Sequence, residues 1–438
     1  MTQRHRATLP RVVLAAVAAV GFLTSTPAFP AGFQVNSQAA RATGMGLAFA
    51  GIADDPSAIF YNPAGMGWQK HFDTYGNLQF LTRTDADFTG LNPYPGDGVL
   101  ESQQKQWFVL PTLFAVVPLT QELNFGLGIF EPYGLGVRWN NPENWSGRFI
   151  SQNAVIKTID LNPNFSYQLF PSLAIAAGAD VRFSKVQLEQ IQGAINPFTG
   201  AFENVAKVKL NSDMIDNTGW GWNVGLMFKP FDALSIGAAY RSKIDVNYDG
   251  TAQFIQRPTG NAAFDAAVAA QLPTGTPPVK TSIAFPASIN IGVGINLGSG
   301  WTIGLEADWT EWSRFASLDI LFPTLVGDDI HRPTLWNDSW AYRVGVEKKF
   351  GEWAVRVGYY YDNTPQPTFD TGPILPDNDR NVYSAGVGWG TERFGLDVGA
   401  LLIKFRDRTV PPPLQTDQFF GTYSETALVL VGGLHMAF

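Results

Sequence analysis

Beyond residue 30 the sequence has three histidines, His71, His331 and His435, which are the first candidates for acid–base chemistry. None lies beside a nucleophile motif, because the chain has no Gly-x-Ser-x-Gly, no His-Glu-x-x-His, no phosphate-binding loop and no carboxylates paired at a useful spacing. Cysteine is absent, so disulfides, thiol catalysis and thiolate metal sites are excluded. The sequence therefore predicts a protein that is not an enzyme and that uses no metal or cofactor.

The first thirty residues have the features of a secretory signal peptide. Arg4, Arg6 and Arg11 precede an apolar stretch over 12–23, and small residues follow up to Ala28. The stretch is shorter than the ~20 residues of a membrane-spanning helix, so we expect residues 1–30 to be removed on export, although the small residues also allow a cut after Ala28. Losing three arginines takes the net charge from −8 to −11, and an acidic chain makes a poor nucleic-acid binder.

Alternating hydrophobicity is the main structural signal in the remaining chain. From Ser288 to Leu297, apolar odd positions alternate with polar or small even positions, and residues 301–310 repeat the pattern. A period of two over nine or so residues predicts a strand that crosses a bilayer at a tilt. Glu306 and Asp308 share one side of the second segment, so that side must face water. The 44 glycines and the 13% aromatic content fit strands with tight turns and aromatic girdles.

Fourteen such strands are expected, and the long connections between them alternate with turns of about three residues, as in barrels whose periplasmic turns are short. A soluble sandwich or propeller could share the composition, but the strands are long for either. The last strand ends in Phe438, and an alternating apolar row with a terminal aromatic resembles the signal recognised by the barrel assembly machinery. The expected strands are 72–84, 104–118, 122–137, 155–170, 172–190, 218–229, 233–248, 288–297, 301–310, 336–349, 352–362, 380–391, 393–406 and 424–438.

We therefore predict an all-β membrane protein, a 14-stranded antiparallel transmembrane β-barrel formed by residues 72–438. Residues 31–71 lack the alternation, are rich in glycine and alanine, and contain a tight corner at Asn62, Pro63 and Ala64. A barrel of this size is too wide for its own side chains to fill, so we expect 31–71 to form a hatch inside the lumen. The alternative is a periplasmic tail.

One long connection, 249–280, contains a helical pattern. Phe264, Val268 and Leu272 follow each other at intervals of four, after a capping Asn261 and before Pro273. We expect a short helix among the outer loops. Its apolar face either receives a hydrophobic ligand or packs on neighbouring loops.

Several blocks of the sequence resemble, in order, the outer-membrane long-chain fatty acid transporter family, the FadL/TodX type. These blocks are AGFQVNSQAARATGMGLAFAG, IADDPSAIFYNPAG, GWGWNVGLMFKPFDALSIGAAYRSKID, DWTEWSRF, WNDSWAYRVGVEKKF, YYDNTPQP and ILPDNDR. The likeness covers nearly the whole chain after the signal peptide and favours cleavage just before Ala31.

The resemblance implies passive transport of a hydrophobic small molecule across the outer membrane of a Gram-negative bacterium. Ligand would first bind at the outer loops and then enter an internal pocket contacted by the N-terminus, with Gly32, Phe33 and Phe130 among its residues. It would leave sideways where the third strand kinks at Pro132, Tyr133 and Gly134. Proline lacks a ladder donor and glycine weakens a strand, so the sequence favours an opening there.

For a carboxylate ligand the resemblance implies basic residues at two positions. Arg332 occupies one of them, whereas Gln190 replaces the expected base at the other. Asp362 matches an acidic family position near the hatch, or is simply a solvated carboxylate in the lumen. Long-chain fatty acids are therefore the first expected substrate, and neutral aromatic or aliphatic hydrocarbons are the alternative.

A general porin or an adhesin is the less favoured alternative to a transporter. Expected partners are the hydrophobic ligand, whose site a detergent could also occupy, together with outer-membrane lipid, lipopolysaccharide and the barrel assembly machinery. No nucleic-acid partner is expected.

Overall fold

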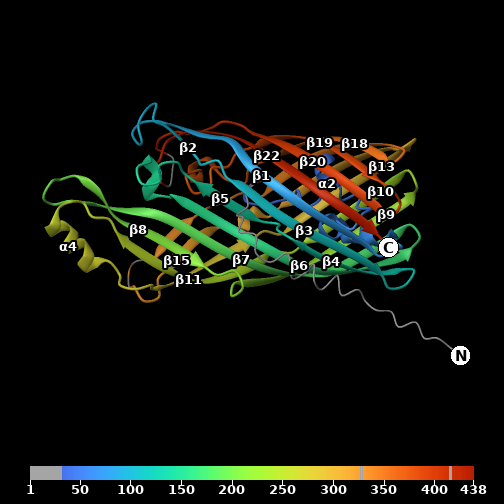
Figure 1. Cartoon of the computed structure of the whole chain (residues 1–438), viewed down its shortest axis with the longest axis horizontal. Coiled ribbons are helices and arrows are strands. Elements are labelled where there is room, and N and C mark those ends of the chain that lie inside the picture. Colours follow the sequence, from blue (N-terminus) through green and yellow to red (C-terminus); the bar gives the residue numbers. More distant parts are fainter. Residues whose placement is uncertain (1–31, 326, 328, 414–416) are drawn as a thin grey trace.

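The computed structural model describes residues 32–325, 327, 329–413 and 417–438, so the expected signal peptide lies outside the described range. Its strands form one continuous antiparallel sheet that closes on itself (Figure 1). No helix among the described residues is long and apolar enough to cross a membrane.

Fourteen strands make the closed wall when β4 and β5 are counted as one interrupted strand, which confirms the predicted number. Each strand pairs with the next, and β22 pairs with β1 from Asp73↔Ala437 to Gly90↔Gly421, which closes the ring. The wall strands are β1 (Asp73–Gly90), β3 (Trp107–Pro118), β4 (Leu123–Phe130) with β5 (Gly134–Arg138), β6 (Asn153–Phe170), β7 (Leu173–Ile195), β9 (Thr218–Phe231), β10 (Leu234–Arg241), β13 (Ser288–Gly298), β14 (Trp301–Thr310), β17 (Ser339–Phe350), β18 (Trp353–Asp362), β19 (Arg380–Gly390), β20 (Phe394–Phe405) and β22 (Gly421–Ala437).

The alternation in sequence separates the two faces of the wall. On β14, the apolar Leu305 is exposed on the outer face, whereas Glu306 and Asp308 are buried on the inner face. Exposed aromatic residues end many outer rows, among them Trp220, Trp222, Trp340, Tyr342, Trp353, Tyr383 and Phe438. A closed sheet with an apolar outer face and aromatic residues at its rims has the surface of a transmembrane β-barrel.

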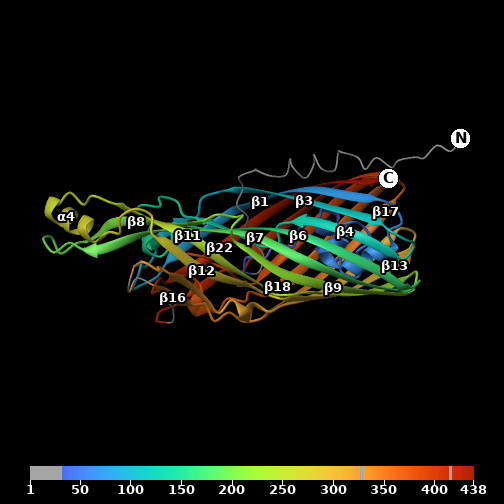
Figure 2. The same ribbon diagram turned by 90° about the horizontal axis from the view of Figure 1, so that it is seen from below.

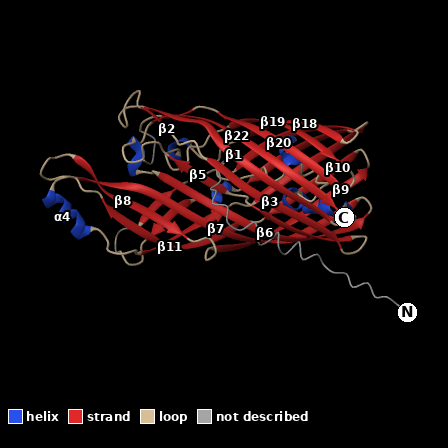
Figure 3. Ribbon diagram, in the orientation of Figure 1, coloured by secondary structure: helices blue, strands red, loops and turns tan. Residues whose placement is uncertain are grey.

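The sheet continues beyond the ring at the end opposite the short turns (Figures 1 and 3). The helix that we expected within 249–280 is present, but we expected no strands in the connections 191–217, 249–280 and 315–335, and this is wrong over much of their length. Strand β7 runs on to Ile195, and the extension adds β8 (Phe202–Ser212), β11 (Ile244–Gln256), β12 (Pro278–Phe285), β15 (Ser317–Leu321), β16 (Ile330–Pro333) and the helix α4 (Ala262–Gln271). Smaller elements are β2 (Leu100–Ser102), β21 (Arg408–Val410) and the short 3-10 helices η2 (Ser146–Phe149), η3 (Trp312–Arg314) and η4 (Thr368–Asp370).

The N-terminal segment, residues 33–69, lies inside the ring (Figure 2). It folds as α2 (Ala40–Gly44), α3 (Ala58–Tyr61) and the 3-10 helix η1 (Pro63–Trp68), and most of its residues are fully buried. Backbone touches backbone, because a Cβ on Gly345 would overlap the Met45 carbonyl and one on Gly358 would overlap the Gly46 nitrogen. Seven successive wall strands, β10 to β20, offer such a glycine to residues 40–51: Gly237, Gly292, Gly304, Gly345, Gly358, Gly386 and Gly399.

Buried charges also fasten the N-terminal segment to the wall. Both Nε and Nη2 of Arg41 donate to the Glu347 carboxylate, at 3.0 and 3.1 Å. Arg356 donates to the same carboxylate at 2.6 Å. On β14, the neighbour of β17 in the ring, Glu306 accepts hydrogen bonds from the backbone nitrogens of Phe49 and Ala50. These pairs fix the segment at several strands because leaving any one charge buried alone would be costly.

Candidate functional site

The wall is interrupted between β3 and β5. The ladder between β3 and β4 ends at Leu113↔Ile129, and β5 forms its ladder with β6. On the other side of β5, its last residue Arg138 accepts a hydrogen bond from Gln104 N at 2.7 Å, next to an isolated bridge between Gln103 and Trp139. The break between β4 and β5 contains Glu131, Pro132 and Tyr133, and the proline has no N–H for a ladder. The structure thus places an interruption of the wall at the predicted kink.

The first described residues pair with this interruption from inside. Val35 N donates to Pro132 O and Gly134 N donates to Phe33 O, each at 2.7 Å, and Gln34 forms an antiparallel bridge with Tyr133. A single short antiparallel pairing therefore satisfies backbone groups that the broken wall leaves without a neighbour. Residues 33–35 and the kink therefore form one hydrogen-bonded unit.

Gln38 ties this unit to the N-terminal segment. Its Nε2 donates to Val35 O and to Glu131 O, both at 2.8 Å, and its Oε1 accepts from Glu131 N at 3.3 Å. The side chain is only 1% exposed, so losing the amide would leave buried carbonyl groups unsatisfied.

Phe33 is the centre of an aromatic cluster that includes Tyr133 of the kink. Its ring lies 4.8 Å from Trp312 and 5.4 Å from Phe315, measured between ring centroids, and about 6 Å from Tyr133 and Trp336. Most of these are edge contacts, the geometry that aromatic pairs favour. The hydrogen-bonded unit at the kink is therefore also held by ring packing.

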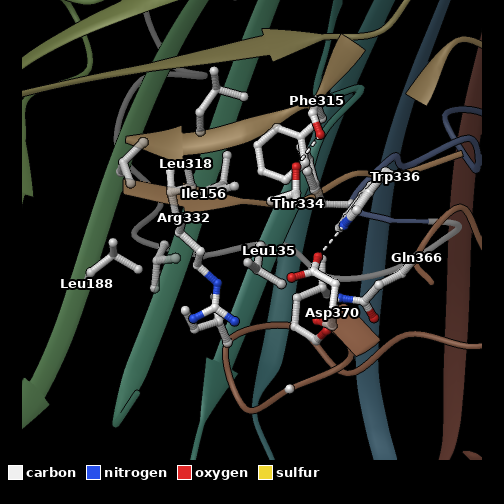
Figure 4. Close-up of a pocket in the computed structure, with 17 residues that line it drawn as sticks. Leu135, Ile156, Leu188, Phe315, Leu318, Arg332, Thr334, Trp336, Gln366 and Asp370 are labelled. Carbon is white, nitrogen blue, oxygen red and sulfur yellow. Dashed lines mark hydrogen bonds between the residues drawn. The ribbon is translucent and has the colours of Figure 1, made fainter. Parts of the chain in front are cut away.

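Phe33 also lines an inner cavity of about 50 Å³ (Figure 4). Most of the lining is aliphatic or aromatic, and beside Phe33 it comes from β5, β6, β7, β12, β15 and the connections around η3 and η4. We call this the inner cavity; its apolar residues are Phe33, Leu135, Val155, Ile156, Val186, Leu188, Ile283, Phe315, Leu318, Trp336, Ile374 and Leu375. Binding pockets for small molecules usually measure 300–1,000 Å³, so this cavity is nearly closed as it stands.

The polar end of the inner cavity carries Arg332, Thr334, Gln366 and Asp370. Arg332 donates to both carboxylate oxygens of Asp417, at 2.8 and 2.6 Å. Asp370 accepts from Trp336 Nε1 at 2.7 Å, as the dashed line in Figure 4 shows. Burial raises the pKa of the Asp370 carboxyl to about 7, although the Trp336 hydrogen bond and Arg332 act against this shift.

A second cavity of about 620 Å³ lies in the extension of the sheet. This outer groove is lined mainly by apolar side chains of β7, β8, β11, β15 and the end of α4. Its lining includes Gln190, Val268 and Leu272, and Leu188 lines both the outer groove and the inner cavity. The structure therefore brings three of the predicted binding residues together in a groove of ligand size.

The other predicted binding residues lie elsewhere. Phe264 is buried and does not line the outer groove, while Phe130 packs on Phe60 and Phe114 beside the N-terminal segment. Gly32 donates its N–H to Asp377 at 3.1 Å, and its φ of 64° suits glycine. Asp362 lies in the lumen, where it is buried and paired with Arg380 at 3.4 Å.

The predicted hatch corner acts inside the N-terminal segment. The Asn62 side chain caps η1 by accepting from Ala64 N, and its Nδ2 donates to Ala50 O and Leu226 O. Pro63 opens η1, as proline often does in the first turn.

Sequence reasoning missed Gln38, Trp312, Trp336, Asp370 and Asp417. The two tryptophans lie in blocks that carry the family resemblance, so that likeness could have pointed to them. Asp370 and Asp417 belong to long connections whose course the alternation does not predict. That Asp417 pairs with Arg332, and that Asp370 lines the same cavity as Arg332, is visible only in three dimensions.

A closed fourteen-stranded barrel with an apolar outer face and a filled lumen defines a transmembrane β-barrel protein. A family model described as "Outer membrane protein transport protein (OMPP1/FadL/TodX)" matches residues 21–438. The chain belongs to this family of outer-membrane transport proteins, which places it in the outer membrane.

Relatives and solved structures agree with this assignment. The chain is 25% identical over 414 residues to the long-chain fatty acid transport protein of Escherichia coli O6:H1, covering 88% of this chain and 89% of the relative. It is 23% identical to outer membrane protein P1 of Haemophilus influenzae over 400 residues, with 83% and 84% covered.

Two solved structures share the fold. A Pseudomonas aeruginosa FadL homologue superposes with a TM-score of 0.79 at 22% identity, covering 93% of this chain and 99% of that chain. The P. putida toluene transporter TodX gives 0.66 at 16% identity, with 87% and 94% covered.

Proposed function

We propose that this chain is a passive channel that admits hydrophobic small molecules with an extended apolar body, long-chain fatty acids first among them. The observation that carries this proposal is that the outer groove and the inner cavity are neighbours, both apolar and both lined by Leu188. Each buried methylene contributes about 0.8 kcal/mol, so an apolar path of this kind binds an alkyl chain mainly through its length.

The route then runs from the outer groove to the inner cavity and out through the wall at the kink. The inner cavity is too small for a long ligand, so Phe33 or its ring partners must move when one enters. Phe33 O accepts a hydrogen bond from Gly134 N, and Val35 N donates one to Pro132 O. Movement of Phe33 would break these hydrogen bonds and open the wall beside Pro132 and Gly134. Ligand binding and sideways exit are thereby coupled through one short pairing.

The N-terminal segment serves in this proposal as a hatch that keeps the barrel closed to water-soluble molecules. Its fit against seven glycine-bearing strands supports this role. Flow needs no energy source if ligand is consumed inside the cell.

Neutral hydrocarbons are the second candidate cargo. Gln190 in the outer groove carries no charge, and the guanidinium of Arg332 in the inner cavity is paired with Asp417. Both features weaken the case for a carboxylate head and leave the apolar path intact.

Uptake of labelled oleate, toluene and dodecane in cells that lack their own transporter of this family tests the proposal. Leu188→Glu should reduce uptake to near the empty-vector rate, because it would place a charge in the apolar lining of both cavities. Leu100→Glu, at a side chain that is 77% exposed on β2, is the matched control and should transport normally. Oleate uptake favours the first candidate, toluene or dodecane uptake alone favours the second, and no uptake of any of the three refutes the channel.

A further inference from the structure

The polar end of the inner cavity points to a particular head group, an inference that rests on the proposed transport function. Arg332 and Asp370 are the charged residues in the cavity lining. The Arg332 guanidinium is held by two hydrogen bonds to Asp417, with side chains only 17% and 10% exposed. A planar pair with two hydrogen bonds neutralises both charges. The net positive charge that the cavity offers to an anionic head group is therefore small.

Asp370 presents the opposite situation. Oδ2 accepts from Trp336 Nε1, whereas Oδ1 is buried and has no hydrogen-bond partner among the described residues. The residue is 4% exposed and lines the cavity. A buried carboxyl oxygen without a partner is costly, and a ligand that donates a hydrogen bond to it would remove that cost.

The side-chain hydrogens of the two neutral residues at this end, Thr334 and Gln366, are already donated to protein oxygens. Thr334 Oγ1 donates to Phe315 O, and Gln366 Nε2 donates to Asp370 O at 3.1 Å and to Leu375 O at 3.0 Å. With two acidic groups, Asp370 and Asp417, around one arginine, the cavity end favours a hydrogen-bond donor over an anion.

We infer that the inner cavity binds amphiphiles whose head group is uncharged and donates a hydrogen bond to Asp370, such as a long-chain alcohol, in preference to ionised carboxylates. The alkyl tail lies among the apolar lining residues and the hydroxyl hydrogen meets Asp370 Oδ1. Asp417 is then a specificity-determining residue, because it removes from the cavity the cation that a carboxylate would need.

The test uses the full-length mature protein in phosphatidylcholine nanodiscs at pH 9, with tritiated 1-dodecanol and tritiated dodecanoate. Protein-free nanodiscs give the partitioning blank. We expect dodecanol to bind about tenfold more tightly than dodecanoate, the effect of one hydrogen bond to a charged group. Asp417→Asn should raise dodecanoate affinity by about tenfold, since Arg332 is then free to pair with the ligand, and should leave dodecanol binding nearly unchanged.

Two further variants keep the result interpretable. Asp370→Asn should also raise dodecanoate affinity, because it removes the facing negative charge without altering the Arg332 pair. Asp407→Asn makes the same chemical change at an exposed carboxylate between β20 and β21 and should change neither affinity. Heat-modifiable migration on gels checks that each barrel is folded.

Equal or tighter binding of dodecanoate by the unaltered protein overturns this inference while leaving the transport function intact. An unchanged ratio of the two affinities in folded Asp417→Asn overturns it as well. Failure of both ligands to bind above the blank refutes the inner cavity as a binding site and the proposed function with it.

Discussion

At the scale of single residues, Asp370 makes the inner cavity sensitive to pH. Burial raises the pKa of its carboxyl to about 7, so the folded protein keeps this proton to a higher pH than the unfolded chain. Its contribution to stability therefore falls as pH rises from about 4 to about 7. The charged groups that face it are Arg332, Asp417 and Arg408. Below pH 7 the cavity loses one negative charge, and an anionic ligand should bind better.

Dodecanesulfonate measures this effect because its head group stays ionised throughout the range. We expect its affinity to rise by about tenfold between pH 8.5 and pH 5.5, as a facing like charge is removed. Asp370→Asn should abolish the pH dependence and hold the affinity near its low-pH value. A slope that persists in the variant would assign the titration to another group.

The same residues show what sequence can and cannot predict of a site. Arg332 was found through its place before the WNDSW block, and the structure does place it in the inner cavity. Its partner Asp417 lies 85 positions away in a connection without periodicity, so its neutralising contact could not be foreseen. Gln190, Val268 and Leu272 were chosen for different reasons and share one groove, because the extension of the sheet brings β7 beside the end of α4.

At the scale of elements, the pairing of residues 33–35 with the kink is the part that has to open if ligand follows the proposed route. The chain has no cysteine, so a disulfide can be introduced without competing thiols. Gln34→Cys with Tyr133→Cys places two thiols at directly opposed positions of an antiparallel bridge, within the Cα separation that a disulfide spans. Oxidation should reduce labelled-oleate uptake to near background, and a reductant should restore it.

The reduced double variant is its own control, since the Tyr133 ring is missing in both redox states. Equal uptake in the oxidised and reduced protein would show that ligand leaves without opening this pairing.

Strands were predictable where lipid dictates the pattern and not beyond it. Within the ring one face meets lipid and the other meets the lumen, so apolar and polar residues alternate as in 288–297. Outside the membrane neither face needs to be apolar, and the five residues of β15 and four of β16 are too short to show a period. This is why the extension was taken for loops. The break at Pro132 was predictable because proline and glycine alter the ladder directly.

At the scale of the whole molecule, the barrel and the N-terminal segment fit each other through glycines. Gly237 pairs with Gly292, Gly304 with Gly345, Gly345 with Gly358, and Gly386 with Gly399 in the strand register. Each glycine follows an apolar residue or alanine in its strand, so the sequence held a signal for a backbone that lies close to the wall. The signal is ambiguous on its own, because glycine also marks bulges.

This fit predicts how the lumen can be opened without dismantling the barrel. Gly345→Val would drive a branched side chain into the Met45 carbonyl, which belongs to backbone and cannot turn aside. We expect the N-terminal segment to be displaced while the strand pairing survives, since valine suits a strand. Liposomes with this variant should swell in arabinose several times faster than those with the unaltered protein. Gly432→Val is the matched control, because a Cβ at Gly432 meets nothing within 4 Å and the position is exposed on the outer face. A folded Gly345→Val barrel that swells no faster than this control would show that residues 33–69 do not close the lumen to sugars.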